Sequence, residues 1–196
     1  SYRRSISITV DESGEVLVRA PLFLSNSKIN EFIQSKSNWI KKQQEKIEKT
    51  KAISNKYDFY NNVYVNDIKI DWNELKKDNK KLTKASFYTQ KFNDEILKNA
   101  ENMASSFNFG GVKIKLCNSR CIWGSCNANR VIKLNWKLVI LPKKLQNYVI
   151  CHELSHIKQM NHSTKFWNEV EKLDQDYKQD RKKLKEYSFI LKESVL

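Results

Sequence analysis

The sequence is poor in the residues that interrupt regular structure, with only four glycines and two prolines among 196 residues. This composition excludes collagen-like, low-complexity and linker-rich chains. Runs of apolar residues are also short: the stretch at 138–141 has four, far fewer than a membrane-spanning helix needs. Since 40% of the residues are hydrophobic, the chain is still long enough to build one ordinary domain with a buried core.

Secretion signals and disulfide patterns are missing as well. Residues 1–20 alternate polar and apolar side chains and include acidic residues, which is unlike a secretory signal. Cys117, Cys121 and Cys126 match neither paired zinc-binding cysteines nor an iron–sulfur run. We therefore expect a cytoplasmic protein with reduced, buried or half-buried thiols. The net charge of +14 favours anionic partners, including weak, non-specific binding to nucleic acid.

Hydrophobic periodicity predicts an α+β fold, with an N-terminal β-hairpin and long helices around a small mixed sheet. We expect the hairpin over 3–20, helices over 27–50 and 84–107, and short strands over 57–70, 112–116 and 130–136. The second helix should end at the glycine pair 110–111. Its apolar stripe comprises Tyr88, Phe92, Ile96, Ala100, Met103 and Phe107. We expect one domain over 1–196, with a strand and helix portion over 1–80 and a catalytic portion over 81–196.

The chain contains only three histidines, and all of them fall within eleven residues, at His152, His156 and His162. The first two belong to an HExxH motif in a segment that is apolar on more than one side, which predicts a buried helix. Burying imidazoles and a carboxylate is costly unless something pairs with them. Residues four apart share one face of a helix, so both rings can bind one zinc ion with Glu153 beside the metal-bound water.

The third zinc ligand must come from beyond the helix, and we expect it to be His162. Asn161 tolerates left-handed backbone and would turn the chain back, and Ser163-Thr164 would cap the next helix. Phe166 and Trp167 would pack that helix down. Glu169 is the alternative third ligand, as in zinc peptidases with a downstream helical glutamate.

The spacing HExxHxxxxxH also occurs in metzincin peptidases, but two features argue against that clan. Gln159 stands where metzincins have glycine, and no methionine follows Met160 to form their downstream turn. Ser125 and Cys126 could serve as nucleophiles, but a zinc site makes a protein nucleophile unnecessary. The basic run 181–183 is expected to be a solvated helix face.

Four ordered motifs resemble the YgjP-like metallopeptidase family: WGSC at 123–126, LNW at 134–136, HELSH at 152–156 and NHSTKFW at 161–167. The hairpin ending at residues 19–21 and the helix with Trp39-Ile40 also resemble the opening of that family. Two positions depart from its pattern: Ile122 and Gln175 stand where members usually carry arginine and proline. The family comprises predicted zinc-dependent hydrolases, related in site layout to SprT-like and WLM-type peptidases.

The resemblance implies a zincin-like core of strand and active-site helix. It further implies one Zn²⁺ ion or another divalent metal, held by His152, His156 and His162, with Glu153 as catalytic acid/base. The cleft wall and candidate substrate-binding residues would be Trp123, Gly124, Ser125 and Asn135. Trp123 could equally be a core aromatic residue.

The leading functional hypothesis is a zinc metallopeptidase, with the peptide lying along an exposed strand near 130–136. One alternative is a metal-dependent nucleoside triphosphate pyrophosphohydrolase, because a basic protein suits an anionic nucleotide, although no GxxxxGK[ST] phosphate loop is present. A DNA-associated SprT-like protease is another, supported only by composition. A purely structural zinc site would need a fourth protein ligand.

Overall fold

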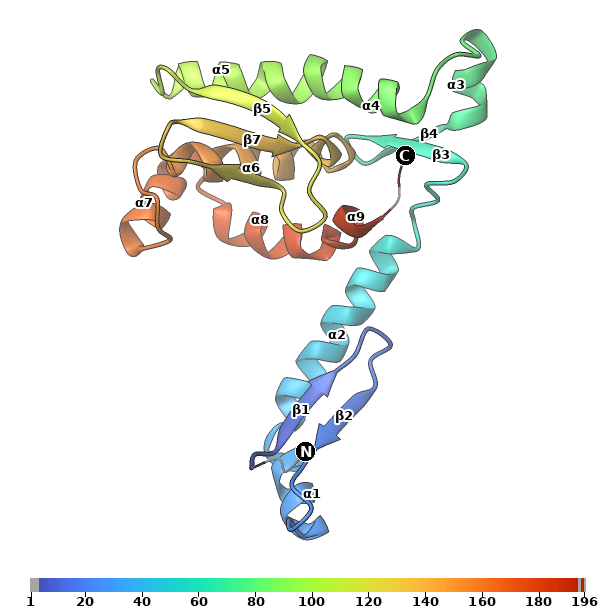
Figure 1. Ribbon diagram of the computed structural model, residues 1–196, viewed down its shortest axis with the longest axis vertical. Helices are drawn as coiled ribbons and strands as arrows, with labels where there is room; N and C mark the ends of the chain where they lie inside the picture. Colours follow the sequence, from blue (N-terminus) through green and yellow to red (C-terminus); the bar gives the residue numbers. More distant parts are fainter. Residues whose placement is uncertain (1–3, 194, 196) are drawn as a thin grey trace. The chain divides into compact units, whose positions relative to one another are not determined.

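The structure is a computed structural model that describes residues 4–193 and residue 195. The chain forms two compact units, residues 1–56 and 57–196. Helices combined with small sheets confirm the predicted α+β class (Figure 1). The division at residue 80 within a single domain stays a prediction. None of the helices in the described part of the chain has the length and apolar character that a membrane span requires.

The first unit begins with the expected hairpin, in which β1 (Ser7–Val10) pairs antiparallel with β2 (Val16–Arg19). The Asp11 carboxylate closes the turn by accepting backbone N–H groups of residues 13–15, and Gly14 has a φ of 98° that suits glycine. The prediction of a single helix over 27–50 is wrong, because this segment forms two helices, α1 (Asn26–Ser35) and α2 (Ser37–Ser54).

The break between α1 and α2 lies at Lys36, whose φ and ψ of −104° and 3° leave the helical region. The Ser35 hydroxyl donates to the Phe32 carbonyl, and the Lys36 N–H bonds back to Ile33. Serine side chains compete in this way for backbone groups, and the apolar period does not reveal the competition.

The second unit opens with another hairpin, β3 (Asn62–Val65) and β4 (Ile68–Asp71), followed by α3 (Trp72–Asp78). Asn66 and Asp67 form its turn with φ values of 55° and 67°, as the primed hairpin turns require. Their backbone N–H groups bond to the carbonyls of Val139 and Ile140. The turn therefore anchors the hairpin to the segment that precedes the HExxH helix.

The helix predicted over 84–107 is interrupted by a π-helical turn. It comprises α4 (Lys84–Lys91), the π segment η1 (Phe92–Leu97) and α5 (Lys98–Ser106). Apart from Phe87, its buried residues are spaced by four: Tyr88, Phe92, Ile96, Ala100 and Ala104. In a regular α-helix this spacing drifts by about 40° per step. The wider π turn compensates for that drift and keeps the stripe facing inward.

The predicted end of this helical stripe is wrong in two respects. Met103 and Phe107 are half-buried, and Ala104 takes the interior position. The helix ends before the glycine pair, because Asn108 already adopts the left-handed conformation with a φ of 59°. Asparagine tolerates this conformation almost as glycine does.

A three-stranded sheet in the order β5-β7-β6 forms the centre of the second unit. β5 (Lys113–Cys117) runs parallel to β7 (Val131–Asn135), and β6 (Gly124–Cys126) is antiparallel to β7. Strand β6 was not predicted, and Trp136 begins the 3₁₀ segment η2 (Trp136–Ile140) instead of ending β7. Because β7 is the central strand, a peptide cannot pair along 130–136 as expected. The edge on that side is β6.

The C-terminal half supplies α6 (Lys143–Ser155), α7 (Thr164–Leu173), α8 (Tyr177–Leu184), η3 (Lys185–Tyr187) and α9 (Phe189–Lys192). Figure 1 shows β5 beside α5, and α6 contacts α5 directly, because the side-chain amide of Asn99 in α5 donates to the Asn147 side-chain carbonyl in α6 at 2.9 Å. Lys137, only 4% exposed, extends from η2 to this end of the chain. Its ammonium donates to the carbonyls of Ile190, Leu191 and Glu193 at 2.8–3.0 Å.

Replacing Lys137 with methionine should destabilise the second unit, since three carbonyls lose a charged donor and become poorly solvated. We expect the free energy of unfolding to fall by about 2–4 kcal/mol in urea titrations. Lys133→Met, on the exposed side of β7, should change it by less than about 0.5 kcal/mol. Equal stabilities for the two variants would contradict the anchoring role of Lys137.

Candidate metal centre

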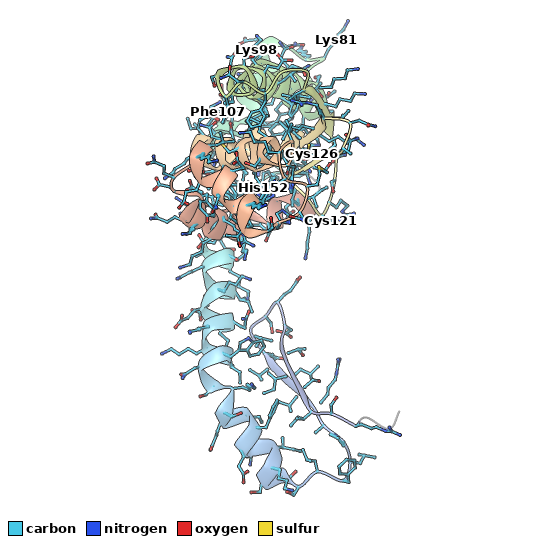
Figure 2. The ribbon with its side chains drawn as sticks, turned by 90° about the vertical axis from the view of Figure 1, so that its left-hand side faces the viewer. Lys81, Lys98, Phe107, Cys121, Cys126 and His152 are labelled. Carbon is cyan, nitrogen blue, oxygen red and sulfur yellow. The ribbon has the colours of Figure 1, made fainter. Side chains whose placement is uncertain are left out.

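The three histidines come from the end of α6 and the loop that follows it. His152 lies in the last turns of α6, His156 caps its C-terminus, and His162 precedes α7. Figure 2 shows the labelled His152 among the C-terminal helices. The expected left-handed turn at Asn161 is wrong, because the non-glycine residues with positive φ in the described chain are Asn66, Asp67, Asn108 and Arg130.

The imidazoles of these histidines converge on one point. The Nε2 atoms of His152 and His162 are 3.1 Å apart, and the three ring centroids are separated by 4.8–5.1 Å. One nitrogen from each ring lies within 4.8 Å of the others. Two nitrogens bound to one tetrahedral zinc at about 2.0–2.1 Å are about 3.3 Å apart. The three side chains therefore fit a single ion.

One backbone carbonyl orients the ring of His156. Its Nδ1 lies 3.1 Å from the carbonyl oxygen of Gln159, which accepts a hydrogen bond when Nδ1 carries the proton. That tautomer leaves the Nε2 lone pair available for a metal, as in many metal sites. The sequence marked Gln159 only as a departure from metzincins. The direction of the Gln159 carbonyl depends on the backbone conformation after the helix end. The identity of the side chain at that position does not predict it.

Aromatic side chains of α7 pack against the cluster. The Phe166 ring lies 4.5–4.9 Å from all three imidazole rings, and Trp167 lies 5.7–5.8 Å from His152 and His162. Ser163 is the N-cap of α7, but its buried hydroxyl makes no capping hydrogen bond. The expectation that Ser163-Thr164 caps α7 is right in position and wrong in mechanism.

Burial favours the uncharged form of His152 and His156. It lowers the pKa of His152 to about 3, with His156, His162 and Arg181 adding to the effect. The pKa of His156 is lowered by the same cause. Neutral imidazole is the form that binds metals. His152 Nδ1 is buried and lacks a hydrogen-bond partner.

Glu153 lies next to the cluster and faces strand β6. It is 5% exposed, and burial raises its pKa to about 8. Its Oε2 atom has no hydrogen-bond partner. A Cβ built on Gly124 would lie 2.8 Å from both Cγ and Oε1 of Glu153. Glycine is therefore required at that point of β6, and a buried carboxylate without a partner is typical of a functional site.

The other candidate cleft residues differ in their placement. Trp123 and Ser125 are half-buried, Ser125 within β6 and Trp123 immediately before it. Asn135 is fully buried, and its amide donates to the carbonyls of Ser119 and Ile122. The expectation that Asn135 contacts substrate is therefore wrong. It shapes the loop that leads into β6.

Glu169, the alternative third ligand, is paired elsewhere. Its carboxylate bonds to Lys158 at 2.9 Å and to Lys172 at 2.5 Å, and it is not part of the histidine group. All four cysteines are free thiols, as expected. Cys121 is exposed, however, so the expectation of buried or half-buried thiols is wrong for that residue.

The family model described as "YgjP-like, metallopeptidase domain" matches residues 4–73 and 62–187. The chain belongs to the YgjP-like metallopeptidase family. The resemblance seen in the motifs is thereby confirmed, and the family makes this chain a zinc hydrolase with a catalytic metal.

Two solved structures are similar to part of the chain. The metallopeptidase zymogen jannalysin of Methanocaldococcus jannaschii is 24% identical, with a TM-score of 0.43 over 47% of this chain and 96% of that one. The metallopeptidase zymogen abylysin of Pyrococcus abyssi is 23% identical, with a TM-score of 0.39 over 46% of this chain and 90% of that one. A search of curated proteins returned no match.

Adding a methyl group at Gly124 should displace the Glu153 carboxylate. We expect Gly124→Ala to keep its metal content and to lose about 10²-fold in hydrolysis, because a shift of about 1 Å at a catalytic group has that effect. Metal analysis and a peptide-cleavage assay would measure both. Gly110→Ala is the matched control, since a Cβ there meets nothing within 4 Å. Full activity in Gly124→Ala would contradict the close approach.

Proposed function

We propose that this YgjP-like protein is a zinc-dependent peptidase in which His152, His156 and His162 hold one zinc ion and Glu153 is the general base. The convergence of one nitrogen from each histidine, next to a buried carboxylate without a partner, supports this proposal most directly. Three protein ligands leave a coordination position open, as in catalytic zinc sites.

The chemistry of the ligands suits zinc. Three neutral imidazoles are ordinary zinc ligands, although a site of this kind also accepts other divalent metals. When bound, zinc lowers the pKa of water and polarises a carbonyl group. The hydrogen bond from His156 to Gln159 would hold that ring in its ligating orientation.

Glu153 would move the proton. Its Oε2 atom is free of hydrogen bonds and can accept a proton from the attacking water. The same carboxyl group can then return the proton to the leaving amine. Its burial excludes competing solvent, and the absence of a side chain at Gly124 leaves the carboxylate its position against β6.

The edge strand β6 is the proposed binding surface for the peptide. An extended chain can add to a free sheet edge through backbone hydrogen bonds. Gly124 lies on this strand directly against Glu153, so a peptide paired with β6 would place a scissile bond near the carboxylate. Trp123 and Ser125 would then contact the neighbouring substrate residues.

Replacing Glu153 with glutamine removes the base without changing the size of the side chain. We expect Glu153→Gln to retain wild-type zinc content and to lose about 10²–10⁴-fold in peptide hydrolysis. Metal analysis of the same sample distinguishes loss of the base from loss of zinc. Retained turnover by zinc-loaded Glu153→Gln protein would contradict the mechanism.

The third ligand can be tested by comparing two substitutions. We expect His162→Ala to lose most of its bound zinc and all measurable hydrolysis, whereas Glu169→Ala keeps both. Zinc affinity measured in competition with a chelator would give the result. A loss of zinc in Glu169→Ala but not in His162→Ala would reverse the assignment.

The substrate class is tested by incubating the protein with casein and with a panel of nucleotides, each with and without chelator. We expect chelator-sensitive cleavage of casein and no phosphate release from nucleotides. Phosphate release without proteolysis would contradict a peptidase.

A further inference from the structure

Arg181 is a basic residue of α8 that lies beside the metal centre. Its guanidinium carbon is 4.4 Å from the centroid of the Trp167 ring. That indole stacks against His162 at 5.7 Å and 21°, and it lies 5.8 Å from His152. The guanidinium and two of the proposed zinc ligands therefore contact the same aromatic ring.

The contact with Trp167 leaves the hydrogen-bonding groups of Arg181 unused. A cation–π contact engages the face of the guanidinium, whereas its five N–H donors point outward in the plane. In the described part of the chain Arg181 has no ion pair and no hydrogen bond, and it is exposed. Residues 181–183 are all exposed, as expected of a solvated face, and Arg181 additionally contacts an indole ring.

Three acidic residues near α8, Glu171, Asp176 and Asp180, are paired with lysines. Lys144 lies 2.8 Å from Asp176 and 3.6 Å from Asp180. Lys178 pairs with Glu171 at 3.9 Å. The positive charge of Arg181 is thus not neutralised by a partner within ion-pair distance, and it contributes to the lowered pKa of His152.

We propose that Arg181 binds a carboxylate of the peptide substrate in a subsite beside the metal-binding histidines, and thereby determines substrate specificity. This inference rests on the proposed peptidase function. Guanidinium binds carboxylate through two parallel hydrogen bonds, and the contact with Trp167 restricts where this guanidinium lies. Two sources offer this group: the C-terminal carboxylate of a short peptide, and an aspartate or glutamate side chain.

The distance between Arg181 and the proposed zinc ligands suits a substrate carboxylate a few residues from the scissile bond. An extended peptide advances about 3.3–3.6 Å per residue, so a carboxylate two or three residues away lies about 7–10 Å along the chain. The Trp167 centroid lies 4.4 Å from the Arg181 guanidinium carbon and 5.7 Å from the His162 ring centroid, so Arg181 lies within this range of that ligand.

The test compares matched substrates on the zinc-loaded full chain. A peptide library cleaved by the wild-type protein first identifies a substrate. It is then made with a free or amidated C-terminus, and with glutamate or glutamine near the cleaved bond. We expect one carboxylate form to have a kcat/KM about 10–100-fold above its neutral partner, mainly through KM. The pair that shows the preference identifies the source.

Arg181→Gln should abolish this preference and leave the neutral peptides within about threefold of wild type. Arg181→Lys should restore only part of it, because lysine keeps the charge and lacks the planar fork. Lys182→Gln removes the same charge one residue away and should retain the full preference. Calorimetric titration of both peptide forms into Glu153→Gln protein, with and without Arg181→Gln, gives the same comparison without turnover.

The outcomes separate the two proposals. If wild-type protein cleaves no peptide, the proposed function fails. If it cleaves peptides without a carboxylate preference, or if Arg181→Gln keeps the preference, Arg181 is not the specificity residue. If Arg181→Gln lowers the melting temperature and leaves the substrate preference unchanged, the role of Arg181 is structural: it packs α8 against α7 and does not bind substrate.

Discussion

Three imidazoles and one carboxyl group converge at the end of α6, and the desolvated part of this cluster, His152, His156 and Glu153, is the constraint on which the site depends. His152 Nδ1 and Glu153 Oε2 are buried without hydrogen-bond partners. Such atoms are costly in a folded protein, which is typical of residues kept for a function. The packing of Phe166 against all three rings shows that the second unit is built to hold them together.

Each surrounding element restricts the position of one or more of these side chains. The helix α6 supplies two histidines at a spacing that its geometry determines, and the Gln159 carbonyl orients one of them. Strand β6 contributes a glycine, which allows the backbone to reach Glu153. Asn135 acts indirectly, since its buried amide donates to two carbonyls of the loop that precedes β6 and thereby positions that strand. The position of the base is therefore set from both the helix and the sheet.

The sequence predicted the features that depend on residue type and local period. The HExxH helix, the N-terminal hairpin and the strands near 112–116 and 130–136 belong to this group. Strand β6 was missed because three residues are too few to show alternation. Asn135 was assigned to the cleft because its amide partners, Ser119 and Ile122, become neighbours only in the folded chain. Arg181 was hidden for the same reason, since nothing in a basic run distinguishes the one residue that meets an indole ring.

The π-helical turn between α4 and α5 has a consequence for the length of this element. A π turn is equivalent to one extra residue in an α-helix, and here it brings Ala100 and Ala104 into line with Tyr88. Removing a single residue between 92 and 97 would restore regular α-helical winding and leave Ala100 and Ala104 on the same face as Tyr88. Inserting a further residue there would rotate everything beyond it by about 100° unless the π segment widened, so this element tolerates shortening by one residue more readily than lengthening.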